Sequence, residues 1–136
     1  MRKYLRIDRN ICVGCRTCQV TCSLARAGII TSKESTVQFK WEDLWQAKWR
    51  IAICVQCKNA KCIEVCPSGA LFKNESGVVC LDKEKCNGCS ECVEACNFNG
   101  IKIGMNGYPV KCDLCSGETY CVYTCPVNAI KLVERR

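Results

Sequence analysis

The chain has 136 residues, which gives room for one compact domain or two very small ones and excludes a large substrate-binding architecture. Its seventeen cysteines are far above ordinary usage, and a short chain with that composition normally contains disulfides or metal. The absence of histidine excludes mixed His/Cys zinc fingers and histidine-dependent acid-base catalysis, while the formal net charge of +7 raises the question of a nucleic-acid partner.

The start of the chain indicates metal rather than disulfides. Residues 1–8 contain no apolar signal core, and no run of the sequence approaches the roughly 18 apolar residues of a membrane helix. We therefore expect a reducing, cytoplasmic location without a membrane span, where stable disulfides are rare. The odd cysteine total would also leave one thiol unpaired in any disulfide scheme.

The predicted secondary structure is short and lies between the cysteines. In chain order, the pattern predicts a strand over 3–8, a turn over 74–77, a strand over 77–82, a helix over 90–96, a strand over 101–103, a helix over 122–125 and a strand over 130–132. Such elements bury little apolar area relative to the conformational entropy that they cost, so we expect metal binding and folding to be coupled.

Residues 31–50 hold all three tryptophans, Trp41, Trp45 and Trp49. Their spacing of four would place the indole rings on one face of a helix. The alternation of apolar residues over 37–41 and again over 49–53 instead favours two strands flanking a short turn. Both interpretations stay open on the sequence. Core packing and a partner interface are also both open for the rings, although this segment is expected to have little core to fill.

Sixteen cysteines form four repeated motifs, and the first and third share the spacing C-x2-C-x2-C-x3-C. The second reads C-x2-C-x4-C-x3-C and the fourth C-x2-C-x5-C-x3-C. In chain order the motifs are Cys12, Cys15, Cys18 and Cys22; Cys54, Cys57, Cys62 and Cys66; Cys86, Cys89, Cys92 and Cys96; and Cys112, Cys115, Cys121 and Cys125. After its fourth cysteine, each motif except the first has a small residue four positions on and an aliphatic residue five positions on.

This spacing suits the chemistry of a 4Fe-4S cube. Cysteines two residues apart let a tight loop present three thiolates to three irons, and Gly14 and Gly88 allow the backbone to approach closely. The fourth cysteine is expected on the following helix, pointing away, so that it reaches a neighbouring cluster. The motifs should therefore work in pairs. Four oxidised clusters with their thiolates carry about −8 in all, so the basic residues are better explained as counter-charge than as a nucleic-acid footprint.

Structural zinc is the alternative for the sixteen cysteines, because paired C-x2-C units are also zinc-ribbon spacing. In every motif, however, the C-x2-C pair is followed by a third cysteine and, after an x3 spacing, by a fourth. This arrangement exceeds the paired C-x2-C units that a tetrahedral zinc site uses. Cys80, the remaining thiol, lies in a predicted strand and is expected to be an inert small residue. Four lysines lie near ligands and could tune clusters or steer a partner, but solvated surface charge is expected for most of them: Lys58, Lys61, Lys85 and Lys111.

Residues 54–103, with Cys66-Pro67, the hairpin at Gly77-Val78-Val79 and Asp82 ahead of Cys86, resemble a bacterial two-cluster ferredoxin. From Asn10 to Leu132 the chain resembles the four-cluster electron-transfer subunits of molybdenum and tungsten pterin oxidoreductases, such as formate dehydrogenases and aldehyde oxidoreductases. Asn97 and Ser23 depart from that pattern, because they replace the proline that usually follows the fourth cysteine.

The resemblance implies an α+β fold of two fused bacterial two-cluster ferredoxin-like units with pseudo-two-fold βαββαβ order. Residues 1–30 with 104–136 would form the outer unit, 31–50 a tryptophan-containing insertion, and 51–103 the inner unit. It also implies four 4Fe-4S clusters, each bound by three cysteines of one motif and the fourth of the paired motif. The implied sets are Cys12, Cys15, Cys18 with Cys125; Cys112, Cys115, Cys121 with Cys22; Cys54, Cys57, Cys62 with Cys96; and Cys86, Cys89, Cys92 with Cys66.

For function, the resemblance implies a non-catalytic subunit of anaerobic metabolism that relays electrons between a tungsten or molybdenum pterin subunit and a further carrier, such as ferredoxin or a flavin subunit. The short C-terminal end favours the compact tungsten aldehyde oxidoreductase type. A free-standing polyferredoxin and a zinc-stabilised binding module are the alternatives, and the apolar tryptophan segment favours the subunit. The sequence contains no catalytic base, pterin or flavin signature, or glycine-rich nucleotide loop.

Overall fold

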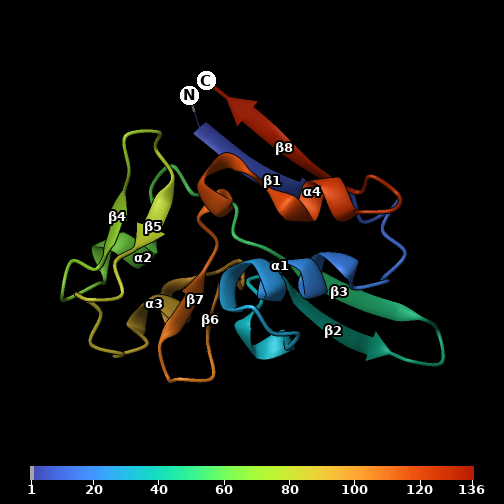
Figure 1. Ribbon diagram of the computed structural model, residues 1–136, viewed down its shortest axis with the longest axis horizontal. Coiled ribbons are helices and arrows are strands. Elements are labelled where there is room, and N and C mark those ends of the chain that lie inside the picture. The colour runs from blue at the N-terminus through green and yellow to red at the C-terminus, as the bar shows by residue number, and fades with distance from the viewer. Residues whose placement is uncertain (1) are drawn as a thin grey trace.

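The computed structural model describes residues 2–136, which form short helices and two-stranded antiparallel sheets packed around the cysteine loops (Figure 1). The strands are β1 (Arg2–Ile7), β2 (Gln38–Asp43), β3 (Lys48–Ala52), β4 (Leu71–Lys73), β5 (Val79–Leu81), β6 (Ile101–Ile103), β7 (Pro109–Lys111) and β8 (Ile130–Arg135). The α-helices are α1 (Thr17–Ala27), α2 (Lys61–Glu64), α3 (Glu91–Ala95) and α4 (Tyr120–Thr124), with 3-10 turns η1 (Ser32–Glu34) and η2 (Leu114–Gly117). Within residues 2–136, no helix is long and apolar enough to span a bilayer.

All four predicted strands exist, with altered lengths at two of them. The strand predicted over 77–82 is shortened to β5, because Asn74 forms a turn in which its Oδ1 accepts the N–H of Val78 at 2.9 Å. The strand predicted over 130–132 is extended to β8, because it pairs along the whole of β1. The helices predicted over 90–96 and 122–125 are confirmed as α3 and α4, and α1 and α2 lie where a helix was expected at the end of the first and second motifs, whereas β4 and β7 were not predicted.

The tryptophan segment is a β-hairpin, so the two-strand interpretation is confirmed and the helical one is wrong. Trp41 in β2 lies opposite Trp49 in β3, with the ring centroids 5.9 Å apart and the rings nearly perpendicular. The turn is stabilised by Asp43, whose Oδ1 accepts the N–H groups of Trp45 at 2.9 Å and Gln46 at 3.1 Å. The strand pairing of residues 38–43 with 48–52 excludes the helix.

The core is divided into two apolar clusters, and the tryptophan segment contributes to the larger of them. That cluster packs Leu5, Val37, Ile51 and Ile130 against several cysteines. Val37, 1% exposed, is the single buried apolar side chain of residues 31–50, so this segment fills little of the core, as expected. The smaller cluster joins β4, β5 and β6 around the cysteines of the second and third motifs.

The sheet pairing links distant parts of the chain. β1 and β8 pair with Arg2 opposite Arg135 and Ile7 opposite Ile130, which brings the two ends of the described chain side by side (Figure 1). β6 pairs with β7, so one small sheet contains residues from both sides of position 103. These pairings place the first motif beside the fourth, and α1 packs against α4.

Candidate metal centres

Each C-x2-C loop curls at the residue before its second cysteine, where the backbone is left-handed in all four motifs. The φ values there are 70° at Gly14, 49° at Gln56, 73° at Gly88 and 59° at Leu114. Such turns direct successive backbone N–H groups toward one side, which makes a concavity for an anion of the kind found at iron-sulfur sites. The sequence indicated the two glycines only. Gln56 and Leu114 adopt the strained conformation because both are almost fully buried and held in place.

A glycine at position 14 is also required by the indole ring of Trp49, which packs against it. A Cβ at this position would lie 3.0 Å from Cε2 of Trp49, closer than ordinary packing allows. The indole ring therefore packs directly on the loop between Cys12 and Cys15. This contact fixes the hairpin, close to its turn, to the first cysteine motif.

The repeated tail after the fourth cysteine has a clear structural reason. The N–H of the small residue donates to the cysteine sulfur, at 3.3 Å from Gly100 to Cys96 and at 3.2 Å from Ala129 to Cys125. A Cβ on Gly100 would lie 2.8 Å from the Cα of Cys54, so only a very small residue fits there. The aliphatic residue that follows, Ile101 or Ile130, is buried in the core.

The tail also changes the acidity of the thiols. Burial alone would raise the pKa of Cys125, but hydrogen bonds from backbone groups of residues 127–130 outweigh it and lower that pKa. The pKa of Cys66 is lowered in the same way, against its burial, by the backbone of Leu71 and by Ser68. A residue with positive φ precedes the small one in every tail, namely Gly69, Asn99 and Asn128. Glycine and asparagine are the residues that tolerate this conformation, so the sequence carried a further signal that was missed.

The fourth cysteines do not all lie on helices, which corrects the prediction. Cys22 lies inside α1, whereas Cys66, Cys96 and Cys125 follow the ends of α2, α3 and α4. Helix α1 continues because Ser23 replaces proline, and its fully buried hydroxyl donates to the Ile29 carbonyl and accepts the Thr31 N–H at 3.0 Å.

Cys22 lacks the repeated tail and receives its hydrogen bonds from a different segment. The N–H and the hydroxyl of Thr36 lie 3.3 and 3.2 Å from the Cys22 sulfur. Gln19 holds that segment in place, because its Nε2 donates to the Val37 carbonyl at 3.1 Å. Nothing in the sequence marked Thr36, since it lies fourteen positions beyond the cysteine.

The fold brings the thiols of the first and fourth motifs together crosswise. Burial, together with the charges of Cys12, Cys15 and Cys125, raises the pKa of Cys18 to about 11. Those four cysteines line one cavity. The pKa of Cys121 is raised to about 12 by burial and then by Cys112, Cys22 and Cys115.

The second and third motifs show a similar grouping. Burial raises the pKa of Cys57, followed by the charges of Cys54 and Cys96. Burial, together with the charges of Cys62, Cys89 and Cys86, raises the pKa of Cys92 to about 11. Cys66 packs against the apolar cluster that contains Cys92. At neutral pH, buried thiols with raised pKa values are protonated unless a metal replaces the proton.

Lys111 differs from the other lysines near the cysteines. Lys58, Lys61 and Lys85 are exposed, as expected, whereas Lys111 has only 2% of its surface exposed. Its Nζ donates to the Cys54 sulfur at 2.8 Å and to the Cys112 carbonyl oxygen at 3.0 Å. An ammonium group buried on a sulfur atom needs a negatively charged partner, so this contact fits a thiolate better than a neutral thiol.

Gln56 joins the same two motifs. Its side chain is fully buried, its Nε2 donates to the Cys112 carbonyl at 2.7 Å, and its Oε1 accepts the N–H of Val79 at 2.8 Å. One side chain thereby connects the Cys54 loop to the fourth motif and to β5. Sequence reasoning missed this role because glutamine carries no metal-binding signal.

Comparison with known proteins identifies the family. The model of the 4Fe-4S dicluster domain family matches residues 46–135. The chain belongs to this family. As a 4Fe-4S dicluster protein it binds iron-sulfur clusters, and its short helices and strands agree with the predicted ferredoxin-like α+β class.

Relatives of this dicluster protein are named as electron-transfer subunits. It is 38% identical over 118 residues to the polyferredoxin-like subunit of the aliphatic sulfonate oxidoreductase of Pyrococcus furiosus, covering 85% of this chain and 67% of that one. It is 33% identical over 117 residues to the thiosulfate reductase electron transfer subunit of Salmonella typhi, covering 80% and 60%. The names of these relatives agree with the predicted electron-transfer chain.

Larger proteins contain similar segments. The beta subunit of the NADH-dependent phenylglyoxylate dehydrogenase of Aromatoleum evansii is 37% identical over 116 residues, which are 83% of this chain and 26% of that subunit. Across the three relatives, the chain spans between about a quarter and two thirds of their length. Among solved structures, a chain of the active site complex BamBC of benzoyl coenzyme A reductase matches with a TM-score of 0.58 and 25% identity, covering 98% of this chain and 78% of that one.

The cysteine geometry of the dicluster protein suits a cube with four irons. Within residues 2–136, no three Cys, Asp or Glu side chains are grouped closely enough to hold a single metal ion. The thiolates of a 4Fe-4S cluster each bind a different iron, so they do not need to converge on one point. The left-handed loops, the N–H groups directed at sulfur and the cation at Cys54 are all features that stabilise an anionic cluster.

Cys80 stands apart from the four motifs. It lies in β5, is half-buried, and its thiol donates to the Val78 carbonyl at 3.6 Å. Burial raises its pKa, followed by the charge of Asp113, so it is less reactive than an exposed thiol. This placement agrees with a small structural residue.

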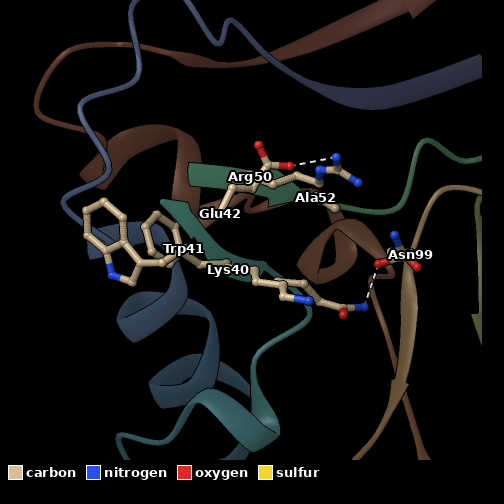
Figure 2. A pocket seen from close by; sticks show the side chains of 8 residues that line it. Lys40, Trp41, Glu42, Arg50, Ala52 and Asn99 are labelled. Atoms are coloured by element: carbon tan, nitrogen blue, oxygen red, sulfur yellow. Dashed lines mark hydrogen bonds and ion pairs between the residues drawn. The ribbon is translucent and has the colours of Figure 1, made fainter. Parts of the chain in front are cut away.

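The tryptophan hairpin borders a hollow of about 770 Å³ that contains no cysteine (Figure 2). Figure 2 shows the ion pair between Glu42 and Arg50, whose Oε1 and Nη2 lie 2.6 Å apart, on the β2–β3 surface. The Gln38 amide donates to the Asn99 carbonyl and so joins the hairpin to the tail of the third motif. Glu42 and Arg50 thus pair with each other in the lining of the hollow, which also contains Lys40.

Proposed function

We propose that this protein relays electrons through four 4Fe-4S clusters, bound by the four crosswise cysteine sets, within an oxidoreductase complex. The observation that supports this most strongly is the meeting of thiols more than one hundred positions apart, since Cys125 acts on the pKa of Cys18 together with Cys12 and Cys15. The outer unit would comprise 1–30 with 104–136 and the inner unit 51–103, with 31–50 carrying the hairpin.

The spatial order of the four cysteine sets follows from thiols of one set that change the pKa of a thiol in the next set. Cys18 contributes to the raised pKa of Cys121, Cys54 to that of Cys112, and Cys62 to that of Cys92. These links support a linear order that begins with the Cys12 set, continues through the Cys112 and Cys54 sets, and ends with the Cys86 set. When bound, the clusters accept and release single electrons. The chain's own part is to hold them in that order, with hydrogen bonds to the ligand sulfurs.

One end of this order carries an apolar surface for a partner. At the tip of the β2–β3 hairpin, Trp45 is 99% exposed and Leu44 is 70% exposed, and Trp49, close to this tip in β3, packs on the Cys12–Cys15 loop. Exposed tryptophan is a typical anchor of protein interfaces. The partner that binds this surface in the proposal is a catalytic subunit, because the named relatives are subunits of oxidoreductases, reductases and dehydrogenases.

The finer identity of the partners follows from the family resemblance in the sequence. It favours a tungsten or molybdenum pterin subunit of anaerobic metabolism at the hairpin, and a ferredoxin or flavin subunit near the Cys86 set. A free-standing polyferredoxin is the second candidate. The exposed hairpin tip favours the subunit, because a free carrier gains nothing from an apolar projection that nothing covers.

Iron content tests the proposal directly. Protein purified without oxygen should be brown and contain sixteen irons per chain with matching sulfide, because four sets of four cysteines are present. Elemental analysis together with sulfide determination gives the ratio. Stoichiometric zinc without iron would exclude the relay and favour the zinc-stabilised module.

Crosswise ligation is tested by removing one fourth cysteine. Cys22→Ala should disturb the cluster held by Cys112, Cys115 and Cys121 and leave the one held by Cys12, Cys15 and Cys18 largely intact, because Cys22 acts on the pKa of Cys121. Electron paramagnetic resonance (EPR) of the reduced protein distinguishes the two. Cys80→Ala is the matched control and should leave every signal unchanged. Selective loss of the cluster held by the first three cysteines would contradict crosswise ligation.

A further inference from the structure

Lys111 is a buried cation at the place where two of the proposed cysteine sets meet. Its Nζ contacts the sulfur of Cys54 from one set and the carbonyl oxygen of Cys112 from the next. In the described part of the chain, no carboxylate lies within ion-pair distance of it. The negative charge that balances this ammonium is therefore on the sulfur side of the contact.

This contact is unlike the other hydrogen bonds to ligand sulfurs. Cys22, Cys96 and Cys125 receive theirs from backbone N–H groups, with a threonine hydroxyl in addition at Cys22. Across residues 2–136, Lys111 is the single lysine or arginine whose side chain donates to a cysteine sulfur. One of the four sets therefore has a full positive charge within hydrogen-bond distance of a ligand, in a buried place where screening by water is weak.

Lys85 provides a natural comparison. It immediately precedes the first cysteine of the third motif, as Lys111 precedes the first cysteine of the fourth. Its side chain is 65% exposed and lies 4.0 Å from Asp82, so water and a carboxylate both reduce its effect. The two lysines have the same local sequence position and opposite environments.

We propose that Lys111 raises the reduction potential of the cluster bound by Cys54, Cys57, Cys62 and Cys96, and makes it the first of the four to be reduced. The inference rests on the proposed function, because it requires a cluster at those cysteines. Reduction adds one electron and one negative charge, and a cation hydrogen-bonded to a ligand sulfur stabilises the more negative state. Gln56 positions the contact, because it holds the Cys112 carbonyl that Lys111 also uses.

The test is a redox titration of the full-length, anaerobically purified protein, followed by EPR, with iron measured on the same samples. Lys111→Met should reduce the equilibrium constant for one-electron reduction of the first-reduced cluster at least tenfold, which is about 59 mV toward negative potential. Lys111→Arg keeps the charge and should keep most of the potential. Lys85→Met is the matched control and should shift nothing.

The possible outcomes separate the two proposals. Full iron content with an unchanged potential in Lys111→Met would overturn the role of Lys111, whereas wild-type protein without clusters would overturn the proposed function instead. If Lys111→Met does not bind its iron, the variant Cys57→Ser identifies the cluster that is reduced first, because a serine ligand alters the EPR spectrum of its own cluster. The altered spectrum must belong to the cluster that is reduced first, and its assignment to a later one would overturn the inference.

Discussion

Removal of iron from the purified protein is expected to abolish its cooperative folded structure. Six of the 21 buried apolar side chains are cysteines of the proposed sets, and the sheets have only two strands each. Isolated two-stranded sheets are marginal at best, and a small domain is typically stable by about 5–15 kcal/mol. Structural metal in small domains can contribute about 10 kcal/mol or more, so its loss exceeds what this core can supply.

The measurement is circular dichroism during thermal unfolding, before and after oxidative removal of iron with a chelator under anaerobic conditions. Holoprotein should show a cooperative transition and apoprotein should show none. Reconstitution with iron, sulfide and reductant should restore the transition, which distinguishes metal loss from chemical damage. Cys80→Ala should behave as wild type in both states. A cooperative transition that survives complete iron removal would show that the apolar clusters fold alone.

Removal of this chain from its native complex is expected to abolish electron transfer to the physiological acceptor. The catalytic subunit should still reduce small artificial dyes, because a dye can collect electrons at the catalytic centre directly. The two activities are measured on the complete complex, on the depleted complex and after adding the chain back. Physiological transfer that persists without the chain would rule out the relay.

The hairpin tip provides a milder form of the same test. Leu44→Ala with Trp45→Ala should weaken association with the catalytic subunit by at least tenfold, because anchor tryptophans often contribute about 2 kcal/mol or more. Iron content should not change, since the side chains of Leu44 and Trp45 are 70% and 99% exposed. Trp49 is left intact because it packs on Gly14. Tyr123→Ala, which removes a 78% exposed ring on α4, is the matched control and should leave binding unchanged.

The sequence could predict what depends on local spacing. The tail after the fourth cysteine recurs because the N–H four positions on must reach the cysteine sulfur. Both groups of this contact lie within five consecutive residues, so it depends on local sequence alone. The hairpin of residues 38–52 could be predicted only as one of two interpretations. Its alternation of apolar residues was visible, but the decisive residue is Asp43, whose role in the turn depends on the strands on both sides.

Features that depend on tertiary contacts could not be predicted. Lys85 and Lys111 occupy the same position before a cysteine motif, yet one is exposed and the other is buried on a sulfur of a different motif. Thr36 approaches Cys22 only because the chain turns back after α1, where Ser23 allows the helix to continue. In each case the deciding partner lies far along the sequence, where residue type and spacing give no information.

The pairing of β1 with β8 also determines the order in which the protein can be completed during synthesis. β1 is synthesised before the other described elements and β8 after them, so residues 2–7 lack their partner strand until residues 130–135 have been made. In the proposed arrangement, both inner cysteine sets are present once Cys96 has emerged, whereas the outer sets wait for Cys121 and Cys125. In that arrangement, iron and sulfide can be inserted in the middle of the chain before the outer sets are complete.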